Sequence, residues 1–200
     1  MTATATRKRT QAAPEGLTED EFDRLMDPRA TGDPRATTYK RDRMLLEVLA
    51  GTGLRINEAL TLDRSRVNLE KCSIRVTAAR SKSGRARTVY FGPTLRDKLQ
   101  RYLGELPAAQ FDLFVTRTGA RMQDSHARRL FKKIARNAEL DPERIHPHVL
   151  RHLYAMRYLS EGGTLDDLRV NLGHSSIRIT QVYLDIASWH RAEAAARLDL

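Results

Sequence analysis

Apolar residues recur at the spacing of an α-helix along most of this chain, and the spacing changes in one place. In residues 36–50 they stand three and four positions apart, as on one face of a helix. Residues 73–77 and 88–91 are instead rich in β-branched side chains, with Ser-Lys-Ser-Gly at 81–84 between them. This pattern predicts an antiparallel hairpin with a basic tip. We therefore expect a mainly α fold with a small antiparallel β-sheet, of the α+β class.

Helices are predicted on both sides of the hairpin. The first opens with a capping box, Thr18-x-x-Glu21, and turns Phe22, Leu25 and Met26 inward. The Pro- and Gly-containing stretch 27–34 is expected to form a loop. The remaining helices are predicted at 36–50, 55–60, 93–103, 125–138, 147–161, 165–172 and 186–198.

Size and composition narrow the class of protein. The 200 residues suffice for one domain with a core of its own. No apolar run approaches the roughly 20 residues of a transmembrane helix. The N-terminus carries Arg7, Lys8 and Arg9 and lacks the apolar region of a secretory signal. Cys72 is the single cysteine, which excludes an internal disulfide and a cysteine-based zinc site and fits a reducing cytosol.

The charge of the chain points to a polyanionic partner. The net charge is +10, and residues 71–91 and 126–136 are basic segments without any acidic residue. A positive face of this kind suits a phosphate backbone. A membrane surface is the alternative, but the apolar residues of 126–136 have the pattern of an ordinary core stripe. We expect DNA contacts from Arg80, Arg85, Arg87, Arg128, Arg129, Lys132 and Lys133.

Three stretches carry residues suited to chemistry at a phosphate. In the first, Arg55 starts a helix just after Gly53. The N–H groups and the dipole at a helix start already favour an anion, and an arginine adds a bidentate clamp. Glu58, one turn later, is placed to orient Arg55. Taken alone, this stretch is better explained by a solvated surface arginine.

The second stretch places His148 and Arg151 on one helix face. A histidine beside an arginine suits phosphoryl chemistry, because one carries a proton while the other stabilises charge. His148 and His152 also have the i, i+4 spacing of metal ligands. However, Val149 stands where the zincin motif has glutamate, and no carboxylate cluster is nearby in the sequence.

The third stretch runs from Leu172 to Tyr183. Gly173 is expected to end a helix as its C-cap, and His174 follows it. A tyrosine with its usual pKa of about 10 is a poor nucleophile without activation, so Tyr183 alone would be an ordinary core or surface residue. Two arginines, two histidines, a hairpin lysine and a tyrosine together fit a phosphoryl transfer without metal.

In their residues and in their order along the chain, these stretches resemble the motifs of the tyrosine recombinases, or phage integrase family. The resemblance extends from about residue 17 to residue 185. The first arginine motif of that family matches Thr52-Gly53-Leu54-Arg55-Ile56-Asn57-Glu58-Ala59-Leu60. Its hairpin lysine best matches Lys82, and its HxxR box matches His148 and Arg151. Its LGH box matches Leu172-Gly173-His174, and its nucleophile matches Tyr183.

The resemblance implies the catalytic-domain fold of the family and site-specific DNA recombination. Tyr183 would attack a phosphate and form a 3′-phosphotyrosyl bond. Arg55, Arg151 and His174 would stabilise the transferred phosphate, Lys82 would protonate the leaving 5′ oxygen, and His148 would handle the tyrosine proton. The resemblance implies no metal, no ATP and no other cofactor. It also implies no small-molecule substrate.

The resemblance also implies partners and a place of action. These are double-stranded DNA and further copies of the chain, forming a tetramer on DNA in the cytoplasm, at the nucleoid. Residues 186–200 are expected to form a C-terminal helix that either packs on its own domain or docks into a neighbouring copy. Family members usually carry a separate DNA-binding domain in front, whereas residues 1–16 here suggest a flexible basic arm or linker. The chain is then either an excised catalytic domain or a naturally short recombinase.

Three other functions stay open at this point. A helical DNA-binding regulator would bind without chemistry, although this sequence lacks none of the residues for cleavage. A type IB topoisomerase would share the chemistry but relax DNA, and the histidine of the LGH box favours the recombinase. A metal nuclease would lose its activity in a chelator.

Overall fold

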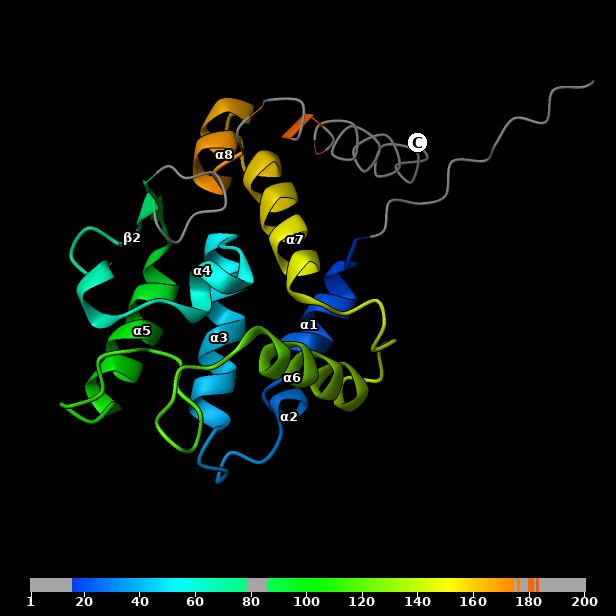
Figure 1. Cartoon of the computed structure of the whole chain (residues 1–200). Helices are drawn as coiled ribbons and strands as arrows, with labels where there is room; N and C mark the ends of the chain where they lie inside the picture. The colour runs from blue at the N-terminus through cyan, green and yellow to red at the C-terminus, as the bar shows by residue number, and fades with distance from the viewer. Residues whose placement is uncertain (1–15, 79–85, 175, 177–179, 182, 184–200) are drawn as a thin grey trace, which may run out of the picture.

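The computed structural model describes residues 16–78, 86–174, 176, 180, 181 and 183 (Figure 1). Three expected features fall outside these residues: the basic arm, the C-terminal helix, and the hairpin tip that holds Arg80, Lys82 and Arg85. The helices are α1 (Glu19–Met26), α2 (Pro28–Thr31), α3 (Tyr39–Thr52), α4 (Ile56–Leu60), the 3₁₀ helix η1 (Arg64–Arg66), α5 (Pro93–Glu105), α6 (Asp124–Asn137), α7 (Pro147–Ser160) and α8 (Leu165–Leu172). The strands are β1 (Val67–Asn68), β2 (Ser73–Val76) and β3 (Arg87–Tyr90).

The predicted fold class is confirmed, and local signals explain most helix starts. At α1, the Thr18 hydroxyl accepts from the Glu21 N–H at 3.1 Å, and Glu21 accepts from the Thr18 N–H at 3.0 Å. The stretch expected to be a loop contains α2. Asp27 caps this short helix by accepting from the Arg29 N–H at 2.8 Å, and Pro28 stands in its first turn.

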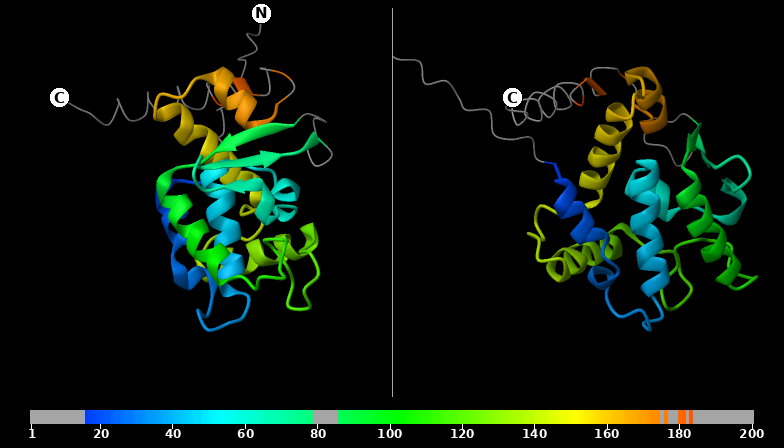
Figure 2. Two further views of the ribbon diagram at one scale, coloured as in Figure 1. Left: turned by 90° about the vertical axis from the view of Figure 1, so that its left-hand side faces the viewer. Right: turned by 180° about the vertical axis from the view of Figure 1, so that it is seen from behind.

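The sheet has the strand order β1-β2-β3 with antiparallel neighbours. Ile74 pairs with Val89, and both side chains are fully buried, while the next pair, Arg75 and Thr88, is exposed. In both views of Figure 2 the strands lie between α5 and α8. The edge strand β1 was not predicted, because two residues are too few to show an alternating pattern.

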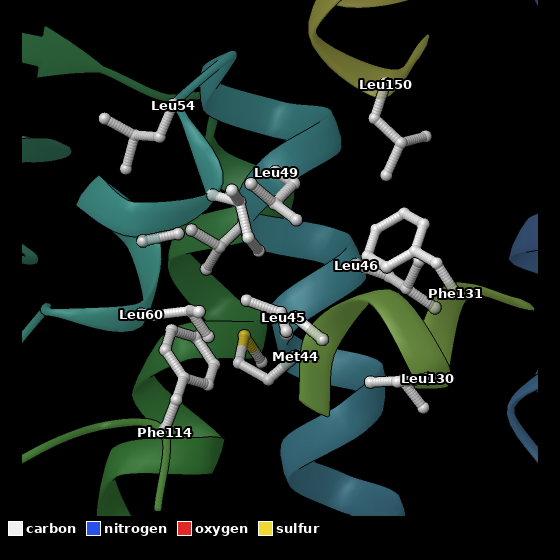
Figure 3. Packing of buried hydrophobic residues seen from close by; sticks show 14 of the residues in the cluster. Met44, Leu45, Leu46, Leu49, Leu54, Leu60, Phe114, Leu130, Phe131 and Leu150 are labelled. Carbon is white, nitrogen blue, oxygen red and sulfur yellow. The ribbon is translucent and has the colours of Figure 1, made fainter. Parts of the chain in front are cut away.

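Helix α3 is the centre of the fold and contacts α2, α4, α5 and α7. Leu45, Leu46, Val48 and Leu49 have no exposed surface, so this helix is covered from several sides. Figure 3 shows Leu46 beside Phe131 of α6, below Leu150 of α7. In the part of the chain that the structure describes, no helix has the length and apolar character needed to cross a membrane.

A smaller apolar cluster joins α7 to α8, away from the main core. Its fully buried members are Ala155, Leu168 and Leu172, and Tyr183 packs against them with part of its ring exposed. The small cluster therefore holds Tyr183 against α7 and α8. Gly53 at the end of α3 lies next to this cluster, because a Cβ on it would be 3.0 Å from Leu172 Cδ2.

Candidate active site

Arg55 stands where α3 gives way to α4. Gly53 ends α3 with φ 62°, and Arg55 is the N-cap of α4. Glu58 accepts from the Arg55 backbone N–H at 3.0 Å and from its Nη1 at 3.2 Å. Arg55 Nη2 also donates to the Gly173 carbonyl at 3.2 Å. The guanidinium is therefore fixed at a helix start, in the position expected for an anion clamp.

Arg151 of α7 is only 4% exposed. It donates to the carbonyls of Gly53 and Leu172, each at 2.7 Å, and its Nη2 lies 2.9 Å from His174 Nε2. Burial, and then the nearby charge of Arg55, lower the pKa of Arg151 to about 10. The group is still a cation at neutral pH, so two positive charges converge beside His174 and Tyr183.

His174 is neutral in this arrangement. Its Nε2 faces a guanidinium, which can only donate, so Nε2 is the acceptor and Nδ1 carries the hydrogen toward Thr180 Oγ1 at 2.8 Å. Burial lowers the pKa of His174 to about 4, and the charges of Arg151 and Arg55 act in the same direction. Protonation would add another cation beside these arginines.

Tyr183 contacts two imidazole rings. Its ring stacks on His174 with centroids 6.4 Å apart and planes 9° apart, and it meets His152 at 5.0 Å. Burial raises the pKa of Tyr183 even though the charges of Arg151 and Arg55 oppose the shift. The phenol is therefore protonated in the free protein and needs a proton acceptor to become a nucleophile.

His148 stands in the first turn of α7, three residues before Arg151. Its ring meets His146 edge-on at 6.1 Å. Burial, and then the charges of His146, Arg151, Arg128 and Arg55, lower the pKa of His148, which favours the neutral base. Among the described residues, no group of three or more His, Cys, Asp or Glu side chains could hold a metal ion.

Sequence reasoning considered His152 only as a metal partner of His148. The structure instead places it against Tyr183. The available signal was its position directly after Arg151, one turn beyond His148 on the same helix. That spacing does not say which side chain the ring will contact, because the contact depends on where Tyr183 returns in the fold.

The expected DNA contacts divide into three groups. Arg87 is corrected: its side chain is 6% exposed and forms a bidentate pair with Glu58 at 2.9 and 2.7 Å, so its guanidinium does not stand on an open face. On α6, Arg129 and Lys133 are exposed, Arg128 pairs with Asp124 and Lys132 pairs with Glu143. Arg80, Lys82 and Arg85 lie outside the described residues.

Gly53 permits a close approach that a side chain would block. A Cβ at this position would lie 2.4 Å from Tyr154 Cδ1, and the residue has φ +62°. We expect Gly53→Ala to destabilise the fold by about 2 kcal/mol or more, from backbone strain plus this overlap. Gly104→Ala in α5 is the control, because a Cβ there meets nothing within 4 Å. Denaturant unfolding measures both, and equal stabilities would contradict the account.

Comparison with known proteins supports the resemblance to the tyrosine recombinases, through a family model and through individual relatives. The model of the phage integrase family matches residues 15–190. The chain is 33% identical over 199 residues to the tyrosine recombinase XerD of Xanthomonas campestris pv. campestris, with 94% of this chain and 60% of that protein covered. It is 31% identical over 195 residues to XerC of Oceanobacillus iheyensis, with coverages of 94% and 62%.

Solved structures share the fold. XerA recombinase matches with a TM-score of 0.73 and 30% identity over 89% of this chain and 61% of that one. The catalytic domain of bacteriophage HP1 integrase matches with a TM-score of 0.62 and 26% identity, covering 92% of this chain and 94% of that domain. The chain spans about three fifths of the length of the curated relatives it matches. On the family model and these relatives, the chain belongs to the phage integrase family of tyrosine recombinases.

Proposed function

We propose that this chain is the strand-cleaving part of a site-specific DNA recombinase. The observation that carries the proposal is the convergence of Arg55, Arg151, His174 and Tyr183 from three separate stretches of the chain. Two fixed guanidinium groups and a tyrosine in one place match what a phosphodiester needs, namely charge stabilisation and a nucleophile.

The reaction begins with attack by Tyr183. Its Oη forms a bond to the scissile phosphorus, and the bond from phosphorus to the 5′ oxygen breaks. The products are a 3′-phosphotyrosyl bond and a free 5′-hydroxyl. Arg55 and Arg151 hold the non-bridging oxygens, where negative charge develops in the transition state.

Two protons move during this step. The protonated Tyr183 gives up its proton to a base, for which we assign His148, and the leaving 5′ oxygen receives one from Lys82. His174 changes its hydrogen bonding when the phosphate arrives. An anion between it and the arginines favours the neutral tautomer with N–H at Nε2. The ring gives up its Nδ1 hydrogen to solvent and takes one from solvent at Nε2, so that Nε2 donates to the phosphate while Nδ1 accepts from the Thr180 hydroxyl.

The covalent bond to Tyr183 conserves the energy of the phosphodiester. The 5′-hydroxyl of a second strand can therefore reverse the step without ATP or a metal ion, and two such rounds exchange the strands of two duplexes. The partners in this proposal are double-stranded DNA and further copies of the chain, assembled as a tetramer at the nucleoid of the cytoplasm. Residues 186–200 would either pack on their own domain or dock into a neighbouring copy.

A pool of nicked duplexes, randomised around the nick, tests the chemistry on many candidate target sequences at once. Cleavage next to a nick releases a short fragment, so the covalent complex cannot revert. We expect a protein–DNA adduct that resists denaturant, forms in EDTA and enriches one sequence class. A metal nuclease would release free ends and stop in EDTA. A DNA-binding regulator would enrich a sequence class without forming an adduct.

DNA binding should depend steeply on salt. The logarithm of the affinity falls with the logarithm of the salt concentration by about 0.9 for each phosphate contact. Arg129→Gln should reduce the slope by about 1 and weaken all duplexes alike, since an exposed α6 arginine contacts the backbone. Lys98→Gln, which removes a lysine of α5 that pairs with Glu47 of α3, is the control. A flat salt dependence would exclude the basic segments as a DNA face.

A further inference from the structure

Arg87 reaches into the active site from the first residue of β3. It donates Nη1 and Nη2 to the two oxygens of Glu58 and Nε to the Asn171 carbonyl at 2.8 Å. We propose that Arg87 is a positioning residue: it holds Glu58 so that Arg55 keeps most of its N–H groups for the scissile phosphate. This inference rests on the proposed function.

The first argument is the number of donors around one carboxylate. Glu58 Oε1 accepts from Arg55 Nη1 and Arg87 Nη1, and Oε2 accepts from the Arg55 backbone N–H and Arg87 Nη2. An ionised carboxylate offers about four lone-pair positions, so this one is fully used. Glu58 therefore takes only one hydrogen bond from the guanidinium of Arg55.

The second argument is what happens to this carboxylate without Arg87. Glu58 is 3% exposed, so water cannot easily replace the two lost donors. The nearest substitute is the Arg55 guanidinium, which can pair with a carboxylate through two parallel N–H groups. That rearrangement would turn Arg55 toward Glu58, away from the Gly173 carbonyl and away from the phosphate.

The third argument is charge. The charges of Glu58 and Arg55 sum to zero, and a phosphate near such a neutral pair is attracted only weakly. Arg87 restores one positive charge at the same place, where its distance from bulk water keeps the interaction strong. Arg87 thus cancels the negative charge of the residue that orients Arg55.

The turn after α8 leaves room for the guanidinium of Arg87. A Cβ at Gly173 would lie 2.9 Å from both Cζ and Nη1 of Arg87. The glycine therefore allows Arg87 to pass directly under the turn that leads to His174. From β3, Arg87 contacts both α4 and the end of α8, and a lysine lacks the planar fork that serves these two partners at once.

The experiment compares Arg87→Met and Arg87→Lys with the unmodified protein on a nicked duplex that the unmodified protein selects from the randomised pool. We expect single-turnover cleavage to fall about 100-fold for methionine and about 10-fold for lysine, while the Kd for DNA changes less than about 3-fold. Arg66→Met is the matched control, because Arg66 pairs with Asp63 at 2.7 Å beside the opposite edge of the sheet. A fall in affinity that accounts for the whole loss of rate would overturn the proposal.

A double-mutant cycle then asks whether Arg87 acts through Glu58. We expect Glu58→Gln combined with Arg87→Met to cleave no more slowly than the slower of the two single variants. Effects that multiply would show that Arg87 acts independently and would overturn the proposal. Arg87→Lys supplies the same comparison if the methionine variant unfolds, because it keeps the buried charge.

A measurement without DNA separates this inference from the proposed function. The ¹⁵N–¹H signal of Arg55 Nε reports the setting of that guanidinium in the free protein. We expect it to shift in both Arg87 variants and to stay in place in Arg66→Met. A signal unchanged by Arg87→Met would reject the positioning role. If the unmodified protein forms no adduct, the proposed function fails instead, while the signal still decides the role of Arg87.

Discussion

Replacing Tyr183 with phenylalanine should abolish the covalent DNA adduct and slow strand cleavage by about four orders of magnitude or more. The substitution removes one oxygen and keeps the ring that packs against His152, His174 and the small cluster of α7 and α8. Folding and DNA affinity should therefore change little. Adducts are counted on a denaturing gel with a labelled nicked duplex, and affinity is measured separately.

The control for this variant is Tyr158→Phe. Tyr158 belongs to the same small cluster and packs against Tyr154 with ring centroids 6.0 Å apart. Removal of its hydroxyl should leave adduct formation within about 2-fold of the unmodified protein, since surface-proximal changes of this size cost little. A denaturant-resistant adduct in Tyr183→Phe would assign the nucleophile to another residue.

The second large effect is expected from the arginines. Arg55→Lys and Arg151→Lys keep the positive charge but lose the fork that can bridge two phosphate oxygens. Each should slow cleavage by about 100-fold or more, given that one preorganised donor contributes about 3 kcal/mol to a transition state. DNA affinity should fall far less, because many other contacts to the backbone persist.

The two variants should differ in stability. A lysine at 151 cannot donate to the carbonyls of Gly53 and Leu172 in the geometry of the two guanidinium nitrogens, so buried acceptors lose partners. We expect Arg151→Lys to lower the Tm and Arg55→Lys, on a side chain 20% exposed, to lower it less. Arg96→Lys, at a residue of α5 whose side chain is 42% exposed beside Asp97, is the control. Parallel loss of binding and cleavage would make Arg55 and Arg151 simple backbone contacts.

Local patterns predicted the helices well because their causes are local. The Thr18 capping box, the left-handed Gly173 and the apolar stripe of α6 each depend on residues a few positions apart. The short elements α2 and β1 were not predicted. Four and two residues provide no period to detect, and β1 forms only because β2 returns beside it.

In the candidate site, too, the features with local causes were predicted and those that depend on distant residues were not. Residue types and order predicted Arg55, His148, Arg151, His174 and Tyr183, whereas the partners of Arg87 depend on the fold. The absence of acids in its own stretch suggested a free cation on the surface. Its carboxylate partner stands 29 positions earlier in the chain, and its carbonyl partner 84 positions later. No local pattern can place those three groups together.

The two carbonyls that hold Arg151 have a consequence for how the molecule opens. They lie at the C-terminal ends of α3 and α8, where helix dipoles place partial negative charge, and they belong to residues 98 and 21 positions away from the arginine. Separation of α8 from α3 would leave the buried Arg151 cation without its two carbonyl acceptors, so local opening at this end is costly. We therefore expect the two helix ends to exchange their amide hydrogens as one cooperative unit. On the proposed function, we therefore expect Arg151 to be in place before DNA binds, so that little binding energy is needed to order it.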